Sequence, residues 1–157
     1  ARKVKLKHPN IKFHLLGRPE ESPDGINKKV VSDWEAEGVI EYLGETNDVR
    51  PYLKDCHAFV LPSYYREGLP RTILEAMATG RAILTTDNVG CREPISEGVN
   101  GFLVPVKNSE VLADRIRWFI NNPDRLIEMG DASYKLAVNK YDVHIINKEI
   151  LQIMELT

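Results

Sequence analysis

The feature that most constrains the fold is an alternation of short apolar runs, each bounded by turn residues, with longer stretches of helical period. The apolar runs predict strands at residues 11–16, 39–43, 58–61, 82–85 and 102–104. The stretches between them predict helices at 27–37, 47–54, 70–79 and 91–97, and further helices follow at 109–121, 124–139 and 143–155. This alternation favours a parallel sheet covered on both faces, so we predict a Rossmann-like, doubly wound α/β fold.

Local signals refine this prediction at a few positions. Residues 58–61 (AFVL) show no polar alternation, which is typical of a central strand that is covered on both faces. Asn47 and Ser109 are the expected N-caps of the helices that begin beside them.

Composition excludes several classes of protein. The chain has 157 residues, 43% hydrophobic and 28% charged, which predicts a single globular domain over residues 1–157. The balance of 21 Lys and Arg against 23 Asp and Glu gives a net charge of −2, without the basic excess of a nucleic-acid-binding domain. No run of eighteen apolar residues predicts a membrane span. Cys56 and Cys91 do not form a disulfide framework and are expected to be reduced thiols.

The loop at residues 62–70 is the strongest candidate for a ligand site. Ligands of open α/β sheets bind outside the carboxyl ends of the strands, and this loop leads from such an end into the helix at 70–79. The backbone N–H groups of Gly68, Leu69 and Arg71 are candidate donors to a phosphate at the helix start, whereas Pro70 has no N–H to offer. The helix dipole adds about 0.3–1 kcal/mol to such binding.

Two carboxylates flank this helix start. Glu67 lies in the loop, and Glu75 lies about one and a half turns into the helix. Carboxylates accept paired hydrogen bonds from vicinal hydroxyls, so a phosphate cradle between them predicts a nucleotide-sugar site. From spacing alone, two ordinary exposed glutamates remain the alternative. Tyr64 and Tyr65 either line the sugar pocket or pack against the loop.

Residues 58–105 resemble the donor-binding domain of the GT-B retaining glycosyltransferases of family four. The resemblance lies in the Glu-x7-Glu pattern of Glu67 and Glu75, the E-A-M-A-x-G helix end at 75–80, the G-x-x-E turn at 90–93 and the N-G-x-L-V-P strand at 100–105. The similar region extends over about residues 11–130. The sequence at 65–81 resembles that of bacterial enzymes that build capsule, O-antigen or lipid-linked oligosaccharides.

The resemblance implies a role for each residue of the loop. Glu67 would be the catalytic carboxylate that contacts hydroxyls of the transferred sugar, and Glu75 would hold the ribose hydroxyls of the nucleotide. The backbone at Gly68 and Leu69 would contact the donor sugar and its diphosphate, and the base would lie near Leu43 and Gly44, after the strand at 39–43. Pro70 and Arg71 complete the expected donor-binding residues, and Arg71 either helps to bind the diphosphate or is a solvated arginine of the first helical turn.

The match also departs from the family. The Arg and Lys that neutralise the donor diphosphate would precede Ala1, and Gly17-Arg18-Pro19 stands where the family often shows Gly-x-Gly. Arg18 is therefore either an additional cation or an exposed loop arginine. GT-B enzymes bind the acceptor and carry a catalytic histidine in an N-terminal domain, so we expect this chain to be the C-terminal half, inactive alone. The apolar residues of the helix at 143–155 are expected to be exposed where they would meet that domain.

The resemblance implies transfer of a sugar from a nucleotide diphosphate, expected to be UDP, to a saccharide or polyprenyl-linked acceptor in cell-surface polysaccharide synthesis. No metal or other cofactor is expected, and the partners are the nucleotide sugar, the acceptor and the missing N-terminal domain. The expected location is the cytoplasm, at the inner face of the membrane through the absent domain. The alternatives are a GT-B sugar-nucleotide epimerase or phosphorylase-like enzyme, and a non-catalytic signalling receiver module.

Overall fold

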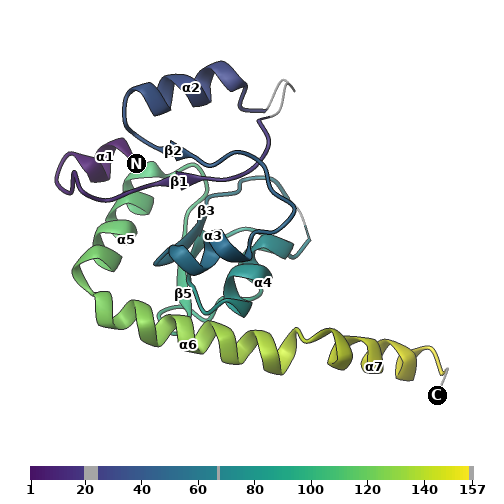
Figure 1. Cartoon of the computed structure of the whole chain (residues 1–157). Helices are drawn as coiled ribbons and strands as arrows, with labels where there is room; N and C mark the ends of the chain where they lie inside the picture. The colour runs from purple at the N-terminus through teal and green to yellow at the C-terminus, as the bar shows by residue number, and fades with distance from the viewer. Residues whose placement is uncertain (20–24, 67, 156–157) are drawn as a thin grey trace. The chain divides into compact units, whose positions relative to one another are not determined.

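The computed structural model describes residues 1–19, 25–66 and 68–155 (Figure 1). These residues form two compact units, Ala1–Val49 and Arg50–Thr157, and each unit has its own sheet. All strand pairs are parallel, and the strands alternate with helices along the chain. The Rossmann-like α/β class predicted from the sequence is therefore confirmed.

The first unit is built on a short pair of strands, β1 (His14–Leu15) and β2 (Glu41–Tyr42), with helices α1 (Arg2–Lys5) and α2 (Lys28–Ala36). Both strands are shorter than the apolar runs that predict them, although hydrogen bonds between the two runs continue beyond the strands, from the Leu43 N–H to the Leu15 carbonyl and from the Gly17 N–H to the Gly44 carbonyl. The Asn27 side chain caps α2 by accepting a hydrogen bond from the Val30 N–H at 3.0 Å.

The second unit contains β3 (Ala58–Leu61), β4 (Ala82–Thr86) and β5 (Gly101–Val104) in the order β3-β4-β5. The central strand is β4, whose residues are all buried, so the prediction of residues 58–61 as the central strand is wrong. Gly101 lets β5 approach β4 closely, since a Cβ there would lie 2.0 Å from the Ile83 carbonyl oxygen.

Helices α4 (Arg71–Ala78) and α6 (Pro123–Lys140) pack against each other and against β4. A close backbone approach joins them, because a Cβ on Gly130 would lie 2.3 Å from the Gly80 carbonyl oxygen. Helix α5 (Ser109–Asn121) packs on β5, and α3 (Arg50–Asp55) precedes β3.

The predicted helix at 91–97 is wrong, because these residues form turns. The buried side chain of Asn100 accepts a hydrogen bond from the Ser96 N–H at 2.7 Å and donates to the Pro94 carbonyl at 2.9 Å. These bonds use the backbone groups that a helix would need, so the segment folds around Asn100 instead.

Two predicted N-caps also fall on other residues. Helix α3 begins at Arg50 rather than beside Asn47, since the Thr46 hydroxyl forms a local turn by accepting from the Asp48 N–H at 3.1 Å. Asn108, one residue before the predicted Ser109, caps α5 by accepting from the Val111 N–H at 3.1 Å.

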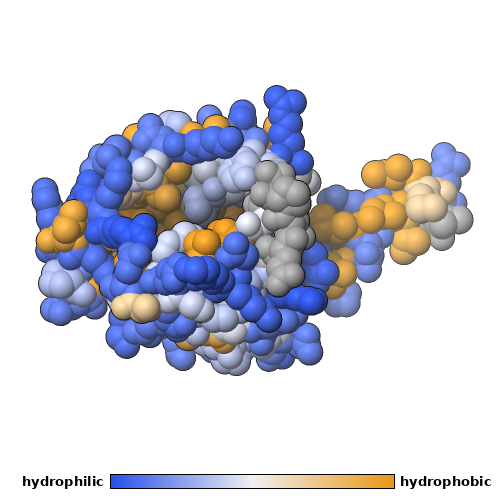
Figure 2. Space-filling view, turned by 90° about the horizontal axis from the view of Figure 1, so that it is seen from above, coloured by the Kyte–Doolittle hydropathy of each residue, from blue (hydrophilic) through white to orange (hydrophobic). Residues whose placement is uncertain are grey.

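The last helix, α7 (Val143–Ile153), extends from the end of α6 and buries no residue (Figure 1). Apolar side chains gather on it in the space-filling view (Figure 2). The exposed ones are Val143, Ile145, Ile150, Leu151, Ile153 and the adjoining Met154. Their predicted exposure is thus confirmed, and α7 carries an apolar surface without a partner in the described chain. No helix of the described ranges is both long and apolar enough to cross a bilayer.

Candidate functional site

The parallel pairing of β3, β4 and β5 brings their carboxyl ends to one edge of the sheet of the second unit. The register pairs Leu61 with Thr85 and Thr86 with Val104, so the three strands end close to one another. The segments 62–70, 87–100 and 105–108 all leave from this edge. This is where an open α/β sheet binds ligands.

The start of α4 has the properties of an anion site. The helix begins at Arg71 after the buried Pro70, which has no side-chain group to cap it. The first backbone bond within the turn runs from the Ile73 N–H to the Pro70 carbonyl at 3.1 Å. The N–H groups at the helix start therefore remain directed toward the edge of the sheet. Gly68 is exposed and Leu69 half-buried just before this point.

Arg71 and Glu75 lie four residues apart and therefore on the same face of α4. Arg71 is exposed and Glu75 is half-buried, and the opposite face buries Ile73, Ala76 and Met77. Neither the Arg71 nor the Glu75 side chain forms an ion pair or hydrogen bond within the described part of the chain. The charged face of α4 is thus available to a ligand.

Glu67, the predicted catalytic carboxylate, lies outside the described residues. The structure places Glu75, Gly68, Leu69, Pro70 and Arg71 on one continuous segment. The pairing of Glu67 with Glu75 around a ligand stays a prediction.

Leu43 and Gly44 lie at the carboxyl end of β2 in the first unit. The Leu43 N–H donates to the Leu15 carbonyl at 2.9 Å, and the Gly44 carbonyl accepts from the Gly17 N–H at 2.9 Å. These bonds hold the ends of β1 and β2 together. Gly44 has φ +78°, a backbone conformation that residues with a Cβ adopt only with strain.

A cavity of about 200 Å³ adjoins these strand ends within the first unit. The Tyr42 hydroxyl donates to the Gly17 carbonyl at 2.9 Å at its wall. Its lining is mainly apolar, with one cation, and includes Leu15, Gly17, Arg18, Ile26, Val31 and Tyr42. Arg18 is exposed and also lines the cavity, and its role as an additional cation stays a prediction.

The structure places Lys107, which the sequence did not indicate, beside the tyrosines of the loop. Tyr64 and Tyr65 stack with ring centroids 4.3 Å apart, joined by a hydroxyl–hydroxyl bond of 2.9 Å, and both are about half exposed. The Nζ of Lys107, after β5, lies 4.6 Å from the centroid of the Tyr64 ring. Lys107 has φ 57°, a backbone conformation that is unusual for lysine and that the sequence does not predict.

Within the described ranges, no group of three or more His, Cys, Asp or Glu side chains is placed to hold a metal ion. The polar groups at the start of α4 are backbone N–H groups, the Arg71 guanidinium and the Glu75 carboxylate. These groups suit a ligand that combines an anion with hydroxyls.

Comparison with known proteins identifies the class. Residues 1–136 match the family described as glycosyl transferases group 1, and the chain belongs to this family. A relative from Campylobacter jejuni, N,N'-diacetylbacillosaminyl-diphospho-undecaprenol alpha-1,3-N-acetylgalactosaminyltransferase, is 32% identical over 143 residues, which is 91% of this chain and 36% of the relative.

Two solved structures are similar in fold. Anabaena Alr3699/HepE in complex with UDP gives a TM-score of 0.84 at 22% identity, over 99% of this chain and 46% of that one. Staphylococcus aureus TarM, solved as the G117R mutant with Fondaparinux, alpha-GlcNAc-glycerol and UDP, gives 0.83 at 25% identity, over 95% and 30%. The chain thus spans about a third of its Campylobacter relative and less than half of these structures.

The two glycines of the predicted site allow a matched test of backbone strain. A methyl group added to either glycine would meet open space, but only Gly44 has a positive φ. We expect Gly44→Ala to lower the free energy of unfolding by about 1–2 kcal/mol. Gly68→Ala should change it by less than about 0.5 kcal/mol. Urea denaturation measures both, and equal losses would contradict the backbone geometry described for Gly44.

Proposed function

We propose that this chain is the donor-binding domain of a retaining glycosyltransferase that uses a UDP-linked sugar. The observation that carries the proposal is the start of α4. There an uncapped helix N-terminus follows the carboxyl end of β3, and a half-buried carboxylate lies one turn further along. A nucleotide diphosphate sugar presents an anion and hydroxyls, which are the two chemistries that these groups bind.

Each residue then has a distinct role. The backbone at Gly68 and Leu69 and the first N–H groups of α4 bind the diphosphate and the sugar, and Pro70 fixes the entry of the chain into the helix. Arg71 contributes positive charge once an anion is bound. Glu75 accepts hydrogen bonds from the ribose hydroxyls, and Glu67 contacts hydroxyls of the transferred sugar.

The predictions for Leu43 and Gly44 concern the nucleotide base. Their place at the carboxyl end of β2 supports them, since ligands of open α/β sheets bind outside the carboxyl ends of the strands, although neither residue is among those that line the nearby cavity.

The names of the similar proteins support the UDP-sugar and the acceptor class. HepE was solved with UDP and, separately, with UDP-glucose, and TarM with UDP. The Campylobacter relative is named for a diphospho-undecaprenol acceptor, and other relatives are named for colanic acid and lipopolysaccharide core biosynthesis. We therefore propose a saccharide or polyprenyl-linked acceptor in cell-surface polysaccharide synthesis.

We further propose that the acceptor and the remaining catalytic groups belong to an N-terminal domain of a longer enzyme. The share of each relative that this chain covers supports this division. The exposed apolar surface of α7 would pack against that domain, and the chain alone would not transfer sugar, because transfer requires donor and acceptor held together away from water. The diphosphate would be neutralised by N–H groups and basic side chains without a metal. Sugar nucleotides are cytoplasmic, so the enzyme would act there, at the inner face of the membrane through the N-terminal domain.

A transfer assay tests this function. The full-length protein is incubated with UDP-glucose, UDP-N-acetylglucosamine or UDP-N-acetylgalactosamine and a polyprenyl-diphosphate saccharide, and products are identified by mass spectrometry and by the anomeric coupling in their NMR spectra. We expect a glycosylated acceptor that keeps the anomeric configuration of the donor, and none with residues 1–157 alone. An inverted product would contradict retention, and conversion of the sugar nucleotide without transfer would indicate an epimerase.

The role of Glu75 gives a quantitative prediction. A hydrogen bond to a charged group contributes about 1.5–3 kcal/mol, so Glu75→Ala should weaken UDP binding about tenfold to a hundredfold. Glu149→Ala, which removes an exposed glutamate from α7, is the matched control and should leave the affinity unchanged. Isothermal titration calorimetry measures both. Equal affinities of wild type and Glu75→Ala would contradict ribose binding by Glu75.

A further inference from the structure

Side chains at the carboxyl end of β4 donate hydrogen bonds to backbone carbonyls at the end of β3 and in the loop that follows it. Two are threonine hydroxyls and one is an asparagine amide, and their acceptors are every second carbonyl of the segment 61–65. The bonds are Thr85 Oγ1 to Leu61 O at 2.8 Å, Thr86 Oγ1 to Ser63 O, and Asn88 Nδ2 to Tyr65 O at 2.7 Å.

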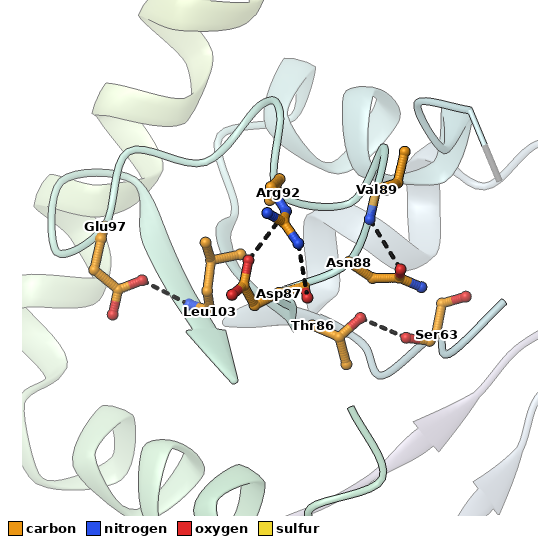
Figure 3. Close-up of polar contacts among 8 residues, drawn as sticks. All are labelled: Ser63, Thr86, Asp87, Asn88, Val89, Arg92, Glu97 and Leu103. Atoms are coloured by element: carbon orange, nitrogen blue, oxygen red, sulfur yellow. Dashed lines mark hydrogen bonds and ion pairs between the residues drawn. The ribbon is translucent and has the colours of Figure 1, made fainter. Parts of the chain in front are cut away.

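This pattern replaces the strand ladder where the ladder stops. The last backbone register pair of β3 and β4 joins Leu61 and Thr85. In an extended segment, alternate carbonyls face the same side. The bonds to Ser63 and Tyr65 therefore keep residues 62–65 extended beside β4. Figure 3 shows Thr86 directed toward Ser63, with Asn88 on the segment that follows.

Asn88 is held by two bonds that fix its orientation. Its Oδ1 accepts from the Val89 N–H at 2.9 Å (Figure 3). Its Nδ2 is therefore the atom that donates to the Tyr65 carbonyl. Thr86 is 2% exposed and Asn88 9% exposed, so water has little access to replace either donor. Loss of either donor would remove a hydrogen bond that holds a loop carbonyl beside β4.

We propose that Thr86 and Asn88 are positioning residues that hold the loop 63–66 so that the backbone of Gly68 and Leu69 meets the sugar of the donor. The inference rests on the donor-binding function proposed for this loop. Thr86 and Asn88 do not touch the donor; they act through the Ser63 and Tyr65 carbonyls. Glu75 lies inside α4, whose position depends on its packing against α6 and β4. Without the loop bonds the diphosphate would still have the first N–H groups of α4 and the ribose would still have Glu75. Loss of the loop bonds should therefore impair binding of the sugar more than binding of UDP.

Four variants distinguish the effect of losing the loop bonds from a general loss of stability. Thr86→Val removes the hydroxyl at nearly constant volume, and Thr86→Ser retains it. Asn88→Asp keeps the acceptor for the Val89 N–H and removes the donor to Tyr65. Thr85→Val is the matched control, because its hydroxyl bonds to Leu61 within β3 rather than to the loop.

The experiment uses the full-length enzyme with UDP and with the one of UDP-glucose, UDP-N-acetylglucosamine and UDP-N-acetylgalactosamine that the wild type uses fastest. For Thr86→Val and Asn88→Asp we expect kcat/KM for the UDP-sugar to fall at least tenfold while the Kd for UDP changes less than threefold. Thr86→Ser should recover at least half of the wild-type kcat/KM. Thr85→Val should lower Tm without changing the ratio of kcat/KM for the UDP-sugar to the Kd for UDP.

Hydrogen exchange of the peptide 62–70 provides a readout that needs no donor, and it should speed up in Thr86→Val and Asn88→Asp but not in Thr85→Val. The positioning role would be overturned if Thr86→Val and Asn88→Asp changed neither the exchange of this peptide nor the ratio of kcat/KM for the UDP-sugar to the Kd for UDP. So would a loss of kcat/KM in Thr85→Val equal to that in Thr86→Val. If the wild-type enzyme neither binds UDP nor consumes a UDP-sugar, the proposed function itself fails. If the wild type binds UDP and uses a UDP-sugar but the variants behave like the wild type, only the positioning role fails.

Discussion

Parallel pairing of β3, β4 and β5 forces three loops to leave the same edge of one sheet, and the candidate site of the second unit depends on this constraint. The strand β4 is buried along its whole length and pairs with β3 on one side and with β5 on the other. The start of α4 and the residues that fix its preceding loop then come from different strands but share one edge. Gly101 maintains this arrangement by letting β5 lie against the backbone of Ile83.

The same edge combines a free helix start with a rigid approach to it. Pro70 ends the loop and leaves the first N–H groups of α4 uncapped, which would be a defect in a helix without a ligand. The loop before it is bonded to β4 through its carbonyls rather than left to fluctuate. A site built in this way loses less conformational entropy on binding an anion, because its donors are already in place.

Sequence patterns predicted the elements well where one physical signal dominated. The strand Ala58–Leu61 and the helix Ser109–Asn121 have the predicted bounds, and Gly80 follows α4 with φ +71° as a glycine after a helix end commonly does. The predictions failed where side chains compete for backbone groups. The buried amide of Asn100 folds residues 94–100 into turns, and Asn108 caps α5 in place of its neighbour.

For the candidate site, the sequence indicated the helix start and Glu75 from the positions of Gly68, Pro70 and the strand before them. It could not indicate the roles of Thr85 and Thr86, because threonine in an apolar strand is explained equally well by its branched side chain. Only the structure shows that the Thr85 hydroxyl meets the Leu61 carbonyl at the end of β3 and that the Thr86 hydroxyl meets the Ser63 carbonyl in the loop. The placement of Lys107 over Tyr64 likewise depends on a tertiary contact between two loops.

Binding of the donor's nucleotide diphosphate at the start of α4 is the central claim. Hydrogen–deuterium exchange of the full-length protein, measured with and without saturating UDP, tests it most directly. We predict slower exchange in the peptides that cover residues 68–75. The claim would be contradicted if calorimetry shows that UDP binds while these peptides exchange at the same rate as in the free protein.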